Sequence, residues 1–207
     1  NIVLPKTSGK GMMIDNVSPT FGWRDMIGIV VTDLTGGDAP NLIPFRGGAV
    51  REYAYNTLDK ADMRFHIPHD LVPNSDIFLH VHWAHNGTAI SGNLVITFAY
   101  TYAKGHQQEI FFAEKTITIS HPTVNIATTP RWRHNITEIQ LSAASPTANQ
   151  MLSSLLETDG LVLLNMTLTT KPTITGGTSA DVFISFIDLH YQSTNMPTKQ
   201  KAPPFHV

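Results

Sequence analysis

The chain has 207 residues, no cysteine and a formal net charge of −2, with only 14% charged residues. Without cysteine it forms no disulfide and no thiolate-bound zinc site. Without a basic excess we expect no nucleic-acid partner. Since no apolar run approaches the roughly 20 residues of a membrane-spanning helix, we expect no membrane partner either.

Residues 1–24 mix Gly, Pro, Ser and Asn with few apolar residues and are predicted to form an N-terminal arm. Residues 25–191 are predicted to form one β-sandwich domain, because Thr and Ile are common and apolar residues recur with period two. Pairs such as Asn86-Gly87 and Gly176-Gly177 mark the turns. The predicted strands are 26–33, 48–56, 61–67, 76–85, 93–103, 109–119, 131–141, 160–170 and 181–191.

In three of these strands, the alternation of apolar residues predicts which side chains share a face. The sets assigned to shared faces are Ile77, Leu79, Val81 and Trp83; Leu94, Ile96, Phe98, Tyr100 and Tyr102; and Val182, Ile184, Phe186 and Asp188, with Phe183, Ile187 and Leu189 opposite. Residues 147–156 predict one short helix from the spacing of their leucines. This element count favours an all-β, two-sheet antiparallel sandwich of jelly-roll type.

Residues 192–207 contain three prolines and no periodicity, and are predicted to form a C-terminal arm. Aromatic rings and Arg in otherwise polar arms are typical of interface anchors. The alternative is that these rings fold back onto their own sandwich. The predicted partner-binding residues are Phe21, Trp23, Arg24, Pro203, Pro204 and Phe205.

Histidines are the strongest candidates for a chemical role such as metal binding or proton uptake. His80 and His82 share a strand face, an arrangement that holds a transition metal in cupin-type barrels, and His85 follows them. No Asp or Glu follows before Glu109, so the sequence predicts no metal site and no cofactor. The histidines are interpreted as groups that hydrogen-bond across strands or line a subunit contact. A pH-sensitive assembly and a histidine-metal enzyme are the alternatives.

Other chemical groups lack a recognisable motif. Asp188 is interpreted as a buried carboxylate paired with a backbone amide, an Arg or His190. Trp83 and Trp132 alternate with apolar neighbours, which favours the core or an interface over exposed stacking on sugars. No nucleophile elbow, Ser-x-x-Lys or phosphate-binding loop occurs, so the chain is predicted not to be an enzyme.

Five segments carry a family resemblance: FGWRD at 21–25, FHIPHD at 65–70, HVHWAHN at 80–86, YAKGH at 102–106 and DLHYQSTN at 188–195. Together they resemble virion structural proteins of tailed bacteriophages, in particular jelly-roll cement or decoration proteins. The resemblance implies a non-enzymatic protein on the outer surface of the capsid. Its implied partners are the major capsid protein and further copies of itself, as a homotrimer. The alternative is a carbohydrate-binding module of a phage tail fibre or spike.

Overall fold

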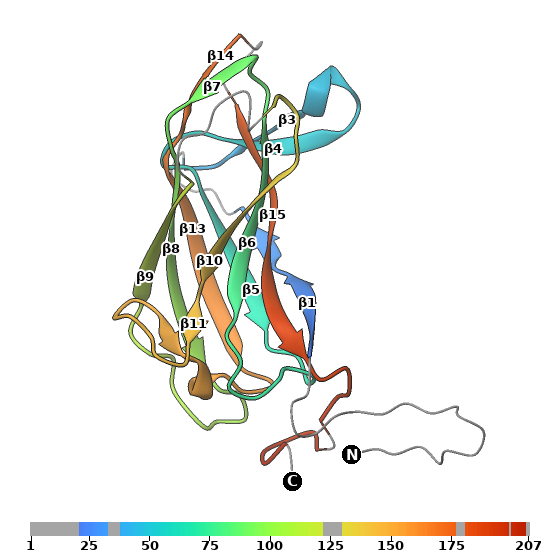
Figure 1. The fold of residues 1–207 in the computed structure, drawn as a ribbon, viewed down its shortest axis with the longest axis vertical. Coiled ribbons are helices and arrows are strands. Elements are labelled where there is room, and N and C mark those ends of the chain that lie inside the picture. Colours follow the sequence, from blue (N-terminus) through green and yellow to red (C-terminus); the bar gives the residue numbers. More distant parts are fainter. Residues whose placement is uncertain (1–20, 33–37, 122–129, 177–180, 199, 206–207) are drawn as a thin grey trace, which may run out of the picture.

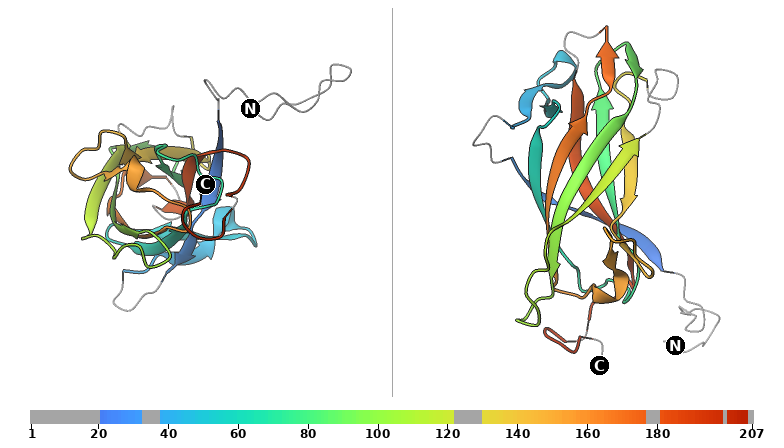
Figure 2. Two further views of the ribbon diagram at one scale, coloured as in Figure 1. Left: turned by 90° about the horizontal axis from the view of Figure 1, so that it is seen from below. Right: turned by 90° about the vertical axis from the view of Figure 1, so that its left-hand side faces the viewer.

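The computed structural model describes residues 21–32, 38–121, 130–176, 181–198 and 200–205. They form an all-β sandwich of jelly-roll type, in which two large antiparallel sheets face each other across one core (Figures 1 and 2). We name the sheets after their central strands. The β6 sheet has the order β10-β6-β15-β4-β3, with β1 also paired to β15, and the β13 sheet has the order β2-β5-β13-β8-β9.

The strands of the β6 sheet are β1 (Gly22–Ile27), β3 (Asn41–Pro44), β4 (Arg51–Tyr55), β6 (Phe78–His85), β10 (Asn135–Gln140) and β15 (Val182–Ser193). Those of the β13 sheet are β2 (Ile29–Val31), β5 (Lys60–His66), β8 (Leu94–Ala103), β9 (Lys115–His121) and β13 (Leu161–Thr170). Two small pairs join β7 (Ala89–Ser91) to β14 (Thr173–Thr175) and β11 (Ser142–Ala143) to β12 (Met151–Leu152).

The period-two pattern builds the core as predicted in β6 and β8. Alternate side chains of each strand are buried and meet across the sandwich: Leu79, Val81, Trp83, Leu94, Ile96, Phe98, Tyr100 and Tyr102. The largest of them, Trp83, is fully buried and donates its indole N–H to Thr137 Oγ1 at 2.9 Å. Both face assignments are therefore confirmed.

The predicted faces of β15 are wrong beyond Ile184. A β-bulge lies between Ile184 and Phe186, so that two residues of β15 span one step of β6. Val182 and Ile184 face the core, but after the bulge Ile187 and Leu189 take over that role. Asp188 therefore lies on the outer face of the β6 sheet, directly opposite His80.

The predicted helix at 147–156 is also wrong. This segment holds the short strand β12 and a 3-10 turn, η2 (Ser153–Leu155). Ser153 donates its hydroxyl to Asp76 Oδ1 at 2.5 Å, and local side-chain bonds of this kind compete with helix formation. No helix in the described part of the chain has the length and hydrophobicity that a membrane span requires.

Several predicted boundaries shift. The strand predicted at 109–119 is regular only from Lys115, and β1 starts at Gly22, so residues 22–24 belong to the sandwich rather than to an arm. The rest of the N-terminal arm, residues 1–20, lies outside the described residues. The β3–β4 hairpin lies at one end of the sandwich and the segment that follows β15 at the other (Figure 1).

Candidate functional site

Two of the residues predicted to bind a partner, Arg24 and Phe205, contact the loop that follows β5 in their own chain. Arg24 donates Nη1–H to Asp70 Oδ2 at 2.9 Å. Asp70 also accepts hydrogen bonds from Ser193 at 2.5 Å and Tyr191 at 3.1 Å, so one carboxylate joins the first strand of the sandwich, β1, to the last, β15. Next to it, Phe205 is buried with its ring against His69 and His106.

The remaining predicted partner-binding residues are more accessible. Trp23 is 48% exposed and stacks on His190 with ring centroids 4.7 Å apart. Pro204 is exposed, whereas Phe21 and Pro203 are half-buried. Nothing in a single chain tests whether these residues bind a partner, so that role stays a prediction. The contacts of Phe205 match the fold-back alternative for that residue.

A pocket of about 480 Å³ opens at the end of the sandwich that carries the β3–β4 hairpin. Trp132 lies half-buried in it, beside the ring of Phe183 at 5.8 Å between centroids. Asn86 and Asp181 line the same pocket and hold each other: Asn86 Nδ2–H donates to Asp181 Oδ2 at 2.8 Å, and the Asp181 backbone N–H donates to Asn86 Oδ1 at 3.0 Å. We name this the Trp132 pocket.

Two arginines give the Trp132 pocket its charge. The guanidinium carbons of Arg131 and Arg46 lie 5.0 and 5.8 Å from the centroid of the Trp132 ring, within the range of cation–π contacts. No ion pair between either arginine and a carboxylate occurs among the described residues. Both side chains are exposed, so their guanidinium groups are accessible to a ligand.

Backbone geometry at the Trp132 pocket is unusual. Trp132 has φ 64° and Arg46 has φ 56°, the left-handed region that bulky side chains avoid. Two backbone hydrogen bonds hold Trp132 in this conformation. Its backbone N–H donates to the carbonyl of His85 at 3.0 Å, and the backbone N–H of Arg133 donates to the carbonyl of Pro130 at 3.0 Å, which closes a turn. Backbone strain of this kind concentrates at ligand-binding sites.

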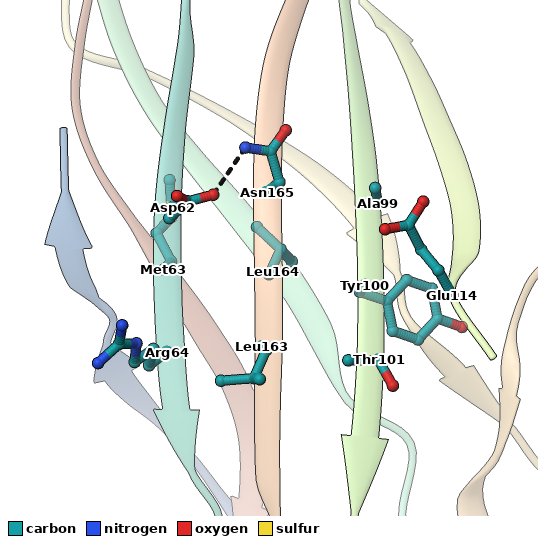
Figure 3. Close-up of a pocket in the computed structure, with 10 residues that line it drawn as sticks. All are labelled: Asp62, Met63, Arg64, Ala99, Tyr100, Thr101, Glu114, Leu163, Leu164 and Asn165. Atoms are coloured by element: carbon teal, nitrogen blue, oxygen red, sulfur yellow. Dashed lines mark hydrogen bonds between the residues drawn. The ribbon is translucent and has the colours of Figure 1, made fainter. Parts of the chain in front are cut away.

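A second, shallower hollow of about 260 Å³ lies on the outer face of the β13 sheet (Figure 3). Asn165 donates Nδ2–H to Asp62 Oδ1 across it at 2.7 Å, and Arg64 lies beside Leu163 on the neighbouring strand. Its one aromatic lining residue, Tyr100, is 1% exposed and belongs to the core. This hollow therefore offers polar groups without an accessible ring.

Histidines and carboxylates form a third group, on the outer face of the β6 sheet. His82 Nε2 lies 2.8 Å from Asp188 Oδ2, and His80 Nδ1 lies 3.5 Å from Asp188 Oδ1. His190, one of the three partners that the sequence suggests for Asp188, instead bonds Asp25. His85 is fully buried elsewhere in the fold and takes no part. We name His80, His82 and Asp188 the His–Asp cluster.

Burial dominates the electrostatics of the His–Asp cluster. It lowers the pKa of His82, although the neighbouring Asp188 carboxylate partly offsets this effect. Burial also raises the pKa of Asp188, reinforced by Asp25 and opposed by His82. A neutral His82 is the form that ligates metals.

No family model and no curated protein matches the chain. Among solved structures it is similar to TmCBM61 in complex with beta-1,4-galactotriose, at 11% identity and a TM-score of 0.28, over 81% of this chain and 86% of that one. It is also similar to the family 11 carbohydrate-binding module from Clostridium thermocellum in complex with a beta-1,3-1,4-mixed-linked tetrasaccharide. The identity is 13% and the TM-score 0.31, over 86% of this chain and 93% of that one.

A further similar structure is the enzymatically active domain of bacteriophage CBA120 tailspike protein 4, at 11% identity and a TM-score of 0.31, over 83% of this chain and 19% of that one. Likeness at this level supports no conclusion about what this chain binds.

Proposed function

We propose that this chain is a non-catalytic saccharide-binding module and that the Trp132 pocket is its site. The observation that carries the proposal is a half-buried indole ring in an open pocket, next to the paired polar side chains Asn86 and Asp181. An aromatic ring supplies an apolar face for the C–H groups of a sugar, and a few fixed polar groups bind its hydroxyls. The volume of about 480 Å³ suits a ligand of one to a few sugar residues.

The two arginines favour an acidic saccharide. Guanidinium groups bind carboxylates and phosphates with two parallel hydrogen bonds, and Arg46 and Arg131 are exposed side chains within cation–π distance of the Trp132 ring. Asp181 keeps its negative charge when the neutral amide of Asn86 bonds it, but two arginines outnumber this one carboxylate among the lining residues. We therefore expect uronate-containing or phosphorylated saccharides to bind more tightly than neutral ones.

A glycan array followed by calorimetry tests the proposal. The wild-type chain is expected to bind acidic oligosaccharides, and Trp132→Ala is expected to weaken binding at least about tenfold, because buried Trp anchors typically contribute 2 kcal/mol or more. Arg131→Gln and Arg46→Gln should weaken acidic ligands more than neutral ones. Trp23→Ala, which removes another exposed indole, is the control and should bind as wild type does.

Two results would contradict the proposal. One is that no saccharide on the array binds the folded chain. The other is that Trp132→Ala, with an unchanged thermal unfolding curve, binds the same saccharide as tightly as wild type.

The resemblance of five segments to virion proteins of tailed phages supports the proposal that this module belongs to a tail fibre or spike that contacts the host surface. Capsid decoration, with the major capsid protein and further copies of the chain as partners, stays a prediction. Among the described contacts, the burial of Phe205 within its own chain reduces the aromatic surface that the C-terminal arm offers to a capsid.

A further inference from the structure

The pairing of β6 with its two neighbours, β10 and β15, brings the residues of the His–Asp cluster together. His80 lies opposite Asp188 of β15 on one side and opposite Glu138 of β10 on the other. The carboxylate missing from the sequence around His80 and His82 is thus supplied by a strand 106 residues away from His82. Because directly opposite residues of an antiparallel pair lie on the same face, all these side chains meet outside the core.

Asp188 has a buried oxygen without a partner. Its side chain is 3% exposed, and Oδ1 forms no hydrogen bond within the described residues. An unpaired carboxylate oxygen removed from water is costly, because the lost hydration is not replaced. His80 Nδ1 lies 3.5 Å from this oxygen, beyond good hydrogen-bonding distance. A positive charge between these two atoms would satisfy the oxygen.

The outer nitrogens of both histidines already have partners. His80 Nε2 lies 2.8 Å from Glu138 Oε2, and His82 Nδ1 lies 2.8 Å from His134 Nε2. When each histidine donates its outer N–H, its inner nitrogen carries a lone pair, and a metal ion bound there takes the place of the present hydrogen bond between His82 Nε2 and Asp188 Oδ2. Metal-bound histidines characteristically donate their other N–H to a carboxylate in this way.

Packing holds the rings in this orientation. The His82 ring is stacked on Phe186 at 4.1 Å and on His134 at 4.9 Å, and the His80 ring is stacked on His190 at 4.4 Å. The inner atoms of the cluster all lie within 4.8 Å of one another. Bonds of ~2.1 Å in a tetrahedral site put ligand atoms ~3.4 Å apart, and the two separations from Asp188, 2.8 and 3.5 Å, are close to that spacing.

We propose that His80 Nδ1, His82 Nε2 and Asp188 bind one divalent transition-metal ion of the zinc class on the outer face of the β6 sheet. Two imidazole nitrogens select such a metal over calcium or magnesium, which prefer oxygen ligands. Asp25 and His190 form an adjoining group with His80, but Asp25 is exposed and already bonded to His190, so it lacks the unsatisfied buried oxygen. The site is separate from the Trp132 pocket and does not depend on a saccharide.

Calorimetry with zinc chloride tests the site, using the full chain without a histidine tag and after treatment with EDTA. Wild type is expected to bind one ion per chain. Asp188→Asn and His82→Ala should each weaken binding at least tenfold, and Glu138→Gln about tenfold by loosening His80. Zinc should also raise the Tm of wild type more than that of Asp188→Asn.

His66→Ala is the matched control, because His66 faces a different carboxylate, Asp159, at 3.3 Å. It should bind zinc as wild type does. If wild type binds no zinc, or if Asp188→Asn binds it unchanged, the proposal is wrong. It is equally wrong if His66→Ala loses binding as much as Asp188→Asn does. Cobalt substitution gives a second measure: the visible absorption expected of a four-coordinate site should appear in wild type and disappear in Asp188→Asn, which is close to isosteric and retains the fold.

Discussion

Replacing Trp83 with alanine is expected to lower the free energy of unfolding by about 3–5 kcal/mol, the usual cost of removing a buried indole ring. Trp83 is fully buried between the two sheets, so the change leaves a large cavity. It also removes the indole N–H that donates a hydrogen bond to Thr137 Oγ1 at 2.9 Å. Urea denaturation followed by circular dichroism measures the loss.

Trp23→Ala provides the comparison, because the same truncation is made at a side chain that is 48% exposed. Its cost should stay near or below about 1 kcal/mol, as for most exposed positions. Trp83→Phe should fall between the two, since it retains an apolar ring and loses the hydrogen bond. Equal losses for Trp83→Ala and Trp23→Ala would contradict the placement of Trp83 in the core.

Alkaline solution is expected to destabilise the fold through two buried tyrosines. Burial raises the pKa of both Tyr100 and Tyr102 to about 12 from 10.0. The folded state therefore keeps both phenols protonated where the unfolded chain ionises. Their stabilisation is complete below pH 10 and is lost as the pH rises toward 12, by about 2–3 kcal/mol for each tyrosine.

The hydrogen bonds that these phenols donate act in the same direction, whereas the Glu157 backbone N–H, which donates to Tyr102 Oη at 2.9 Å, partly offsets the rise in the pKa of Tyr102. Tyr100 donates to the carbonyl of Asn149 at 2.8 Å and Tyr102 to that of Leu155 at 3.1 Å, and a phenolate donates nothing. Urea denaturation between pH 9 and 12 measures the effect. The double variant Tyr100→Phe/Tyr102→Phe should show a flatter dependence on pH. A dependence as steep as that of wild type would assign the alkaline loss to other groups.

Much of the fold is predictable because each strand buries one face. The alternation in β6 and β8 identifies their core residues directly. In β15 the same method fails at the bulge, because an additional residue in one strand leaves no mark in a period-two pattern. The segment 147–156 fails for a different reason: four leucine and methionine residues at helical spacing satisfy short β and 3-10 contacts instead.

The candidate sites depend on contacts between distant segments, which a single sequence does not specify. Trp132 alternates with apolar residues as a core strand residue does, but a left-handed backbone turns it into the pocket at the end of the sandwich. His80 and His82 were identified as a pair from their spacing. Their carboxylate does not show in the neighbouring sequence, because strand pairing brings in Asp188 from a distant segment.

The bulge also determines where this protein tolerates a change in chain length. Ser185 is the supernumerary residue, since Ile184 pairs with Trp83 and Phe186 with the adjacent His82. Its deletion leaves Ile187 and Leu189 facing inward, because the strand then pairs one-to-one with β6. A deletion three or four positions later would instead turn the following side chains over, exchanging apolar for polar groups in the interior. Natural insertions and deletions in β15 should therefore be confined to the neighbourhood of Ser185.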